Sequence, residues 1–188
     1  MGLRRGFKAE ADRLARDMRR ELGLDVHAPL CPRALADHLA IPIRTLEWLY
    51  TVVPDAVSYL RGPKGQSEFS AVTIFEGHRR IIVHNDSHSP KRQVSNLIHE
   101  LSHGLLHHPP KPPFDAAGSR HYDRDLEDEA NWLGPALLIS PEVAMHIAQQ
   151  GYSTRVASNL FSVSEDVVRM RLNVCGVYKR LARRSGMR

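Results

Sequence analysis

The chain has 188 residues, of which 42% are apolar and 25% are charged, and its formal net charge is +5. This composition is typical of a globular protein, and no apolar run approaches the length needed to cross a membrane. The basic N-terminus is not followed by the apolar segment of an export signal. Because Cys31 and Cys175 are far apart and match no pairing pattern, a disulfide framework is not expected. We therefore expect a cytoplasmic protein of one or two domains without a membrane partner.

Basic residues gather near both ends of the chain and account for much of the positive charge. Such runs can bind nucleic acid or an acidic partner, although most of them are solvated surface. The residues concerned are Arg4, Arg5 and Lys8 at one end, and Lys179, Arg180, Arg183, Arg184 and Arg188 at the other.

Helical periodicity dominates the start of the chain. Apolar residues recur at spacings of three and four within residues 7–22, and Gly23 is placed to end that helix. Pro32 then stands in the first turn of a second, short helix. Residues 41–46 alternate and predict an edge strand, because Pro42 cannot donate a hydrogen bond to a ladder.

A β-hairpin and a long helix are expected next. Turn residues surround a short strand expected at 57–60. Residues 70–75 and 80–84 read as strands joined by the short connection Glu76-Gly77-His78, which predicts a hairpin. The helix expected over 91–107 carries apolar residues beside two histidines, so we expect its histidine-bearing side to face inward.

The rest of the chain is predicted to be helical after a proline-rich loop. Four prolines in five positions place residues 108–120 in that loop. Helices are then expected over 123–139, from 141 to Gly151, and near 153–160, 164–173 and 176–184.

Residues 99–103 read His-Glu-Leu-Ser-His, the HExxH pattern. In a helix this spacing puts His99 and His103 on one face, about one turn apart, as two ligands of a tetrahedral Zn²⁺ require. Glu100 then lies where a general base for the attacking water is needed. The motif therefore predicts the centre of a catalytic zinc site.

A third ligand must come from elsewhere in the chain. His107 continues the row, but on one straight helix it lies too far from His99 to share a coordination sphere. The longer pattern HExxHxxGxxH fails, because Leu106 and Pro109 occupy its Gly and His positions. We therefore expect His107 and His108 to be residues of the helix C-terminus.

The following helix offers three acidic residues for the third position, Glu127, Asp128 and Glu129. Measured from an apolar stripe centred near Leu126, Glu129 is the inward-facing acid. A carboxylate on the margin of a buried stripe needs a partner, either a metal or an arginine such as Arg124. We expect Glu129 to be the third ligand, which gives a His₂Glu site with one open position for water.

The chemistry expected of this site is peptide hydrolysis. Zn²⁺ lowers the pKa of its water and polarises the scissile carbonyl, while Glu100 takes the proton and later passes it to the leaving amine. The oxyanion needs a further donor, for which His121, Tyr122 and Tyr152 are candidates by residue type. One catalytic Zn²⁺ is expected, with Mn²⁺ as the alternative ion.

Besides the HExxH motif, short segments along nearly the whole chain have the residues of a known family's pattern. They are 6–11 with Arg19, 22–24, Pro32 with 35–36, 70–71, 82–83 with Asn85, 99–103 with 105–108, and 127–131 leading to 137–138. In these segments the sequence resembles the ImmA/IrrE-type metallo-endopeptidases. The resemblance implies that His99, His103 and Glu129 are metal ligands and that Glu100 is the catalytic acid/base. One departure is that the proline usual after the paired leucines is displaced to Pro141.

The resemblance also implies a fold and a substrate. The fold expected is α+β, with a small mixed β-sheet packed against an HExxH zincin-like (gluzincin-like) helical core and a C-terminal helix-turn-helix-like segment. Residues 1–140 would form the metallopeptidase domain and 141–188 the helical segment. Members of this family cleave a helix-turn-helix repressor and so derepress stress-response or mobile-element genes, which makes such a repressor the expected protein partner.

The C-terminal segment is consistent with that implication. Residues 156–172 read as helix, turn and helix, with Ser164 as an N-cap. Such a pair can contact DNA, dock the repressor or complete the core, and the sequence leaves all three open.

Two other functions remain open at this stage. One is a DNA-binding or protein-docking transcriptional regulator whose metal is structural. The other is a zinc hydrolase of small substrates, such as an amidase. An exposed strand edge at 70–75 or 80–84, together with the loop 108–120, would instead favour an extended peptide held by β-augmentation.

Overall fold

The structure is a computed structural model that describes residues 2–77, 79–109 and 123–185. These ranges form a mixed α+β fold with ten α-helices, one 3-10 helix and a three-stranded sheet. The elements are α1 (Phe7–Glu21), α2 (Pro32–His38), β1 (Ile43–Thr45), η1 (Leu46–Leu49), α3 (Pro54–Arg61), α4 (Gly65–Glu68), β2 (Ala71–Glu76), β3 (Arg79–His84), α5 (Pro90–Leu105), α6 (Arg124–Leu138), α7 (Pro141–Gln149), α8 (Thr154–Leu160), α9 (Glu165–Val174) and α10 (Val177–Ser185).

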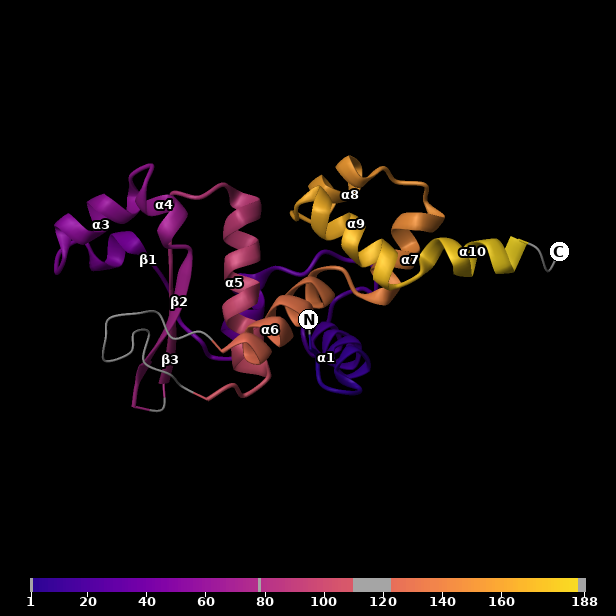
Figure 1. Cartoon of the computed structure of the whole chain (residues 1–188), viewed down its shortest axis with the longest axis horizontal. Coiled ribbons are helices and arrows are strands. Elements are labelled where there is room, and N and C mark those ends of the chain that lie inside the picture. The colour runs from indigo at the N-terminus through magenta and orange to yellow at the C-terminus, as the bar shows by residue number, and fades with distance from the viewer. Residues whose placement is uncertain (1, 78, 110–122, 186–188) are drawn as a thin grey trace.

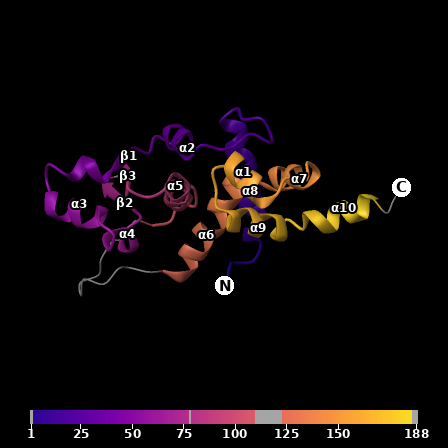
Figure 2. The same cartoon turned by 90° about the horizontal axis from the view of Figure 1, so that it is seen from above.

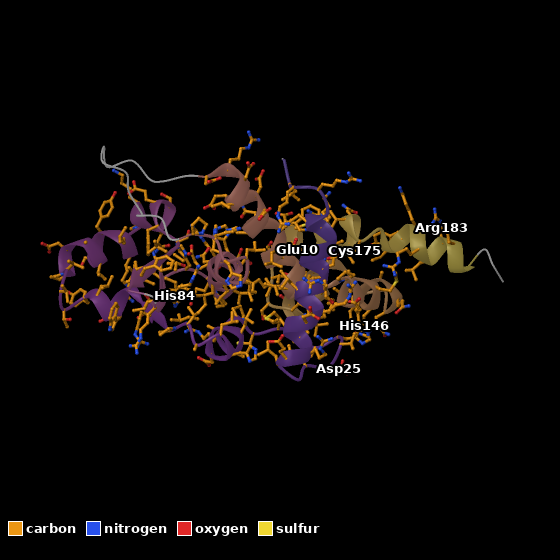
Figure 3. The ribbon with its side chains drawn as sticks, turned by 90° about the horizontal axis from the view of Figure 1, so that it is seen from below. Glu10, Asp25, His84, His146, Cys175 and Arg183 are labelled. Atoms are coloured by element: carbon orange, nitrogen blue, oxygen red, sulfur yellow. The ribbon has the colours of Figure 1, made fainter. Side chains whose placement is uncertain are left out.

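Helix α5 stands at the centre of the molecule. It packs against β2 and β3 on one side and against α6 on the other, and α1 covers α6 in turn. Figures 1 and 2 show this succession of layers, with the C-terminal helices beyond it and α10 projecting from that end. In Figure 3, His84 in the sheet and Arg183 on α10 accordingly lie in opposite halves of the molecule.

The sheet is mixed and has the strand order β1-β3-β2. β1 runs parallel to β3 with Ile43 opposite Ile82, whereas β2 runs antiparallel to β3 with Thr73 opposite Ile82. The predicted hairpin and the predicted edge strand are thus confirmed. The carbonyl of Pro42, which has no N–H to offer, accepts a 2.9 Å bond from the Ile82 amide.

The strand predicted at 57–60 is wrong, because these residues lie in α3. Pro54 occupies the first turn of that helix, where a missing N–H costs nothing. Val57 and Leu60, three residues apart, then pack on one helix face against the cluster that contains Leu46 and Val83. Two apolar residues three positions apart in so short a segment thus belong to a helix face and not to a strand.

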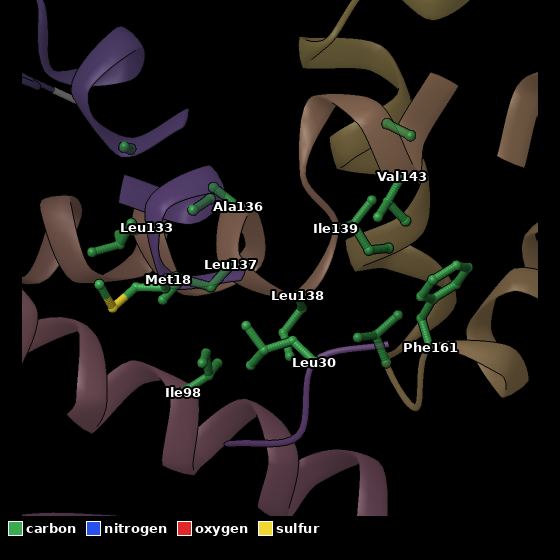
Figure 4. Packing of buried hydrophobic residues seen from close by; sticks show 14 of the residues in the cluster. Met18, Leu30, Ile98, Leu133, Ala136, Leu137, Leu138, Ile139, Val143 and Phe161 are labelled. Atoms are coloured by element: carbon green, nitrogen blue, oxygen red, sulfur yellow. The ribbon is translucent and has the colours of Figure 1, made fainter. Parts of the chain in front are cut away.

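One apolar core joins the helices on both sides of the predicted domain boundary at residue 140. Figure 4 shows Ile98 of α5, Leu133 of α6 and Val143 of α7 among its members, together with Phe161 near the end of α8. The buried residues thus form one continuous cluster along this part of the chain. The division into residues 1–140 and 141–188 stays a prediction.

Two buried arginines hold the C-terminal end of α6. Arg19 of α1 donates from Nη2 to the carbonyls of Leu137 and Leu138, at 3.3 and 3.1 Å. Arg171 of α9 donates from Nε to the carbonyl of Ile139 at 2.8 Å. Carbonyls at a helix end have no partner within the helix, so these two side chains satisfy groups that burial would otherwise leave unpaired.

The C-terminal helices follow the prediction closely. Ser164 caps α9, because its Oγ accepts a 3.2 Å hydrogen bond from the Val167 amide. Gly151 has a positive φ of 65° and separates α7 from α8. Within the described ranges, every helix is too short or too polar to cross a membrane.

Candidate metal centre

The HExxH motif lies in the second half of α5. Pro90 starts this helix at its first turn, and Leu97, Ile98 and Leu101 form its buried side. The same register carries His99 and His103 onto a side that faces α6. The prediction that the histidines lie on an inward-facing part of one long helix is therefore confirmed.

The two imidazoles meet a carboxylate from α6. The Nε2 atoms of His99 and His103 are 3.1 Å apart. Glu127 places Oε2 at 3.2 Å from His99 Nε2 and Oε1 at 3.6 Å from His103 Nε2. Over the described ranges, no other trio of His, Cys, Asp or Glu side chains brings its ligand atoms within 4.8 Å of one another.

These separations fit a tetrahedral metal ion. Three donor atoms bound at about 2.0–2.1 Å to such an ion lie about 3.3 Å from one another. The closest separations lie around that value: 3.1 Å between the two nitrogens, and 3.2 and 3.6 Å from these nitrogens to the two different oxygens of Glu127. Two imidazole nitrogens and one carboxylate oxygen are also the donor set that Zn²⁺ accepts in catalytic sites.

Glu129, which we expected to be the third ligand, lies elsewhere. Its Oε1 accepts a 2.7 Å bond from Arg4 Nε, and its Oε2 lies 3.3 Å from His108 Nε2. The alternative of an ion pair with an arginine is therefore what the structure contains, although the arginine is Arg4 and not Arg124. Geometry favours Glu127 in the third position.

The geometry differs from the expectation because α6 is buried on two sides. One side of α6 faces α1 and the other faces α5. The centre of a single apolar stripe therefore lies between these two buried sides and does not show which acidic residue faces α5. The α5 side carries small residues three and seven positions after Glu127, namely Ala130 and Gly134. A Cβ on Gly134 would lie 3.2 Å from Ile98 Cγ2, so the helices approach closely there. That small-residue spacing was the signal that could have identified Glu127.

Glu100 is almost fully buried, with 9% of its surface exposed. Its Oε2 accepts a 2.6 Å hydrogen bond from Oγ1 of Thr73 on β2. Sequence reasoning missed Thr73, whose only signal was a hydroxyl between apolar residues of a predicted strand. The sheet thus orients the carboxylate that lies next to the first histidine.

The two histidines of the motif titrate differently. Burial lowers the pKa of His103 to about 4, and a positive charge on His99 acts in the same direction. Burial also acts to lower the pKa of His99, but its hydrogen bond to Glu127 and the charges of Glu100 and Glu127 outweigh burial and raise the pKa overall. His103 is therefore neutral at pH 7, and a lone pair remains available for a metal.

A cavity of about 680 Å³ opens beside two of the three clustered side chains, His99 and Glu127. Its lining includes His99, Glu100 and Glu127 at one part, Lys91 and Arg92 near the start of α5, and Val163, Ser164 and Val167 around the start of α9. The cavity therefore connects His99 and Glu127 with the turn between α8 and α9.

The candidate oxyanion donors do not gather at this cavity. His121 and Tyr122 lie outside the described residues. Tyr152 follows α7, where its ring packs against that of His146 with 6.1 Å between ring centroids. It is absent from the residues that line the cavity.

A histidine pair on an HExxH helix, joined by a glutamate from the next helix, is the arrangement of a metallopeptidase. Residues 57–173 match the family model Peptidase_M78, described as the IrrE N-terminal-like domain. Because the match covers more than half of the chain, the protein belongs to this metallopeptidase family, which confirms the resemblance to ImmA/IrrE proteins. A search of curated proteins gave no significant match.

Proposed function

We propose that this protein is a zinc-dependent endopeptidase with a zincin-like core formed by the sheet, α5 and α6. His99, His103 and Glu127 would hold the ion, and Glu100 would be the catalytic acid/base. The observation that carries the proposal is the convergence of two Nε2 atoms and the Glu127 carboxylate, with closest separations of 3.1 to 3.6 Å, next to a second carboxylate fixed by Thr73. Family membership supports the same reading.

Each group has one task in the proposed reaction. A bound Zn²⁺ supplies Lewis-acid polarisation of the scissile carbonyl and of the attacking water. Glu100 accepts a proton from that water as the new C–O bond forms, and returns it to the amine nitrogen as the C–N bond breaks. Thr73 keeps the Glu100 carboxylate directed toward the reacting water, because its hydroxyl donates a hydrogen bond to one of the two carboxylate oxygens.

An extended peptide fits the surroundings of the site. Among the described strands, β2 pairs with β3 alone, so its other edge offers backbone groups to a substrate strand. Thr73 belongs to this same strand, which would place the peptide beside Glu100. These features favour an endopeptidase over an amidase of small substrates.

The substrate we propose is a helix-turn-helix transcriptional repressor, whose cleavage derepresses stress-response or mobile-element genes. The family relationship supports this choice. We further propose that α8 and α9 act as a helix-turn-helix-like docking element, since the cavity extends from His99 and Glu127 to the start of α9. A repressor docked there would have a continuous path to the metal centre.

The test offers a candidate helix-turn-helix repressor, sought among the products of neighbouring genes, to wild-type protein and to Glu100→Gln protein that retains its zinc. Wild-type protein is expected to bind one Zn²⁺ per chain and to cut the repressor, whereas Glu100→Gln binds zinc without cutting. Glu21→Gln, a change at an exposed residue of α1, serves as the matched control and retains cleavage. Cleavage by zinc-loaded Glu100→Gln protein would exclude the role given to Glu100. Salt-sensitive binding to duplex DNA without any proteolysis would support a regulator with a structural metal instead.

A further inference from the structure

Four side chains form a hydrogen-bonded chain that ends at His103. Arg4 Nε donates to Glu129 Oε1 at 2.7 Å, and Glu129 Oε2 lies 3.3 Å from His108 Nε2. His108 Nδ1 lies 2.7 Å from His103 Nδ1. Glu129 and His108 are buried, with 9% and 6% of their surface exposed. The chain thus begins at a half-exposed arginine and reaches the side of the His103 ring that points away from His99.

The backbone at the end of α5 brings His108 into this chain. His107 takes the left-handed conformation with a φ of 52°, so the helix ends there and the chain turns back. The His108 amide donates a 3.0 Å hydrogen bond to the His103 carbonyl, which holds the two residues together. His107 itself is exposed. Of the two histidines that follow the motif, only His108 therefore contacts the metal centre.

Hydrogen-bond chemistry fixes the protons along this chain. A carboxylate only accepts, so the bond to Glu129 requires a proton on His108 Nε2. A neutral imidazole carries one N–H, which leaves Nδ1 of His108 as an acceptor. The proton between the two rings therefore belongs to Nδ1 of His103. The Nε2 of His103 keeps its lone pair, and that nitrogen faces His99 and Glu127.

The other neutral tautomer of His103, with its proton on Nε2, is unfavourable at both ring nitrogens. It would set two lone pairs against each other across the 2.7 Å gap to His108. It would also point an N–H into the space between the three ligand atoms, where no metal could then bind to Nε2.

We propose that His108 and Glu129 are positioning residues of the metal centre, which hold the His103 ring in the Nδ1–H tautomer and in its ligating orientation. Arg4 completes the arrangement by fixing the carboxylate of Glu129. The inference rests on the proposed function only in treating His103 as a metal ligand. It also gives Glu129 a role that does not require contact with the ion.

The first experiment reads the tautomers directly. Nitrogen-15 NMR of the imidazoles in metal-free, full-length protein distinguishes protonated Nδ1 from protonated Nε2. We expect His103 to carry its proton on Nδ1 and His108 on Nε2. A His103 ring protonated on Nε2 in the wild-type protein would overturn the inference, whether or not any variant folds.

The second experiment measures zinc affinity by competition with a chelator. His108→Leu removes the acceptor and is expected to weaken zinc binding by about 10- to 100-fold. His108→Asn places Oδ1 near the position of Nδ1, so it is expected to restore most of the affinity. His107→Asn is the matched control, because asparagine adopts the left-handed conformation of this residue readily, and it is expected to leave the affinity unchanged. Equal affinity of His108→Leu and wild-type protein would contradict the inference.

The two proposals fail in different ways. If the proposed function is wrong, Glu100-dependent cleavage is missing while the tautomers and the order of zinc affinities follow the expected pattern. If only the positioning role is wrong, zinc-dependent cleavage persists and His108→Leu binds zinc as tightly as His107→Asn.

Discussion

Thr73 on β2 donates a 2.6 Å hydrogen bond from Oγ1 to Glu100 Oε2 on α5. The bond crosses from the sheet to the central helix and holds the carboxylate of Glu100, a residue with 9% of its surface exposed. The hairpin is therefore more than a cover for α5, because one of its side chains sets the direction of the proposed acid/base.

Thr73→Val is expected to lower kcat by about tenfold, since it removes a hydrogen bond of about 1.4 kcal/mol to a charged group while keeping the shape of the side chain. Zinc content is expected to stay at one ion per chain, because Thr73 contacts no ligand atom. Thr73→Ser keeps the hydroxyl and is the control that retains activity. Steady-state cleavage of the repressor checks both variants, and unchanged kcat in Thr73→Val would argue against the orienting role.

Gly134 permits the close approach of α6 to α5 that brings Glu127 to the histidines. A Cβ there lies 3.2 Å from Ile98 Cγ2 and 3.5 Å from Ser102 Oγ, so a larger side chain must push the helices apart. Gly134→Leu is expected to lower the free energy of unfolding by about 1–3 kcal/mol and to weaken zinc binding. The free energy of unfolding of Gly134→Ala is expected to stay within about 1 kcal/mol of the wild-type value, since the higher helix propensity of alanine offsets the tight contact of its Cβ with Ile98. Urea unfolding and chelator competition measure the two effects, and full zinc affinity in Gly134→Leu would refute the argument.

Residue spacing was sufficient to predict the helix that carries the site, because the periodicity of α5 and the four-residue spacing of His99 and His103 are properties of one segment. The pairing of β2 with β3 was equally local. Glu127 could not be chosen in this way, since its position depends on how α6 is shared between α1 and α5. A single apolar stripe centred on Leu126 describes neither the contact of α6 with α1 nor its contact with α5.

The missed residues have a similar explanation. The bond of Thr73 to Glu100 joins a strand and a helix, and no periodicity reports which side chains meet across that contact. Arg4 pairs with Glu129, 125 positions further along the chain. Residues 57–60 show a local limit as well, because four residues with two apolar positions fit a strand and a helix alike. There the first-turn Pro54 was the better signal.

Arg19 is expected to be a main source of stability for the end of α6. Arg19→Met leaves the buried carbonyls of Leu137 and Leu138 without their donor and is expected to lower the free energy of unfolding by about 2–4 kcal/mol. Arg20→Met, at a side chain that is 77% exposed, is expected to change it by less than about 0.5 kcal/mol. Equal stabilities of the two variants in urea would show that the carbonyl contacts contribute little.

His84 makes stability depend on pH. Burial lowers its pKa below the ordinary value of 6.5, and the positive charge of Arg33 adds to the effect. The folded state then binds fewer protons than the unfolded state, so the contribution to stability is complete above pH 6.5 and declines as the pH falls below it. His84→Gln keeps an acceptor for Arg33 Nη2 but does not titrate.

Urea unfolding of metal-free protein between about pH 5 and 7.5 checks this contribution, because the other histidines titrate in both proteins and cancel in the difference. The free-energy difference between wild type and His84→Gln is expected to move in favour of the variant as the pH falls. A difference that stays constant over this range would contradict the assignment to His84.

The central claim is the identity of the metal ligands, and the most direct measurement is a crystal structure of the zinc-loaded protein with anomalous data at the zinc edge. We predict one anomalous peak within about 2.0–2.2 Å of Nε2 of His99, Nε2 of His103 and a carboxylate oxygen of Glu127. His108 and Glu129 are predicted to lie outside the coordination sphere. A peak coordinated by Glu129 in place of Glu127, or zinc bound stoichiometrically at another place in the chain, would contradict the account.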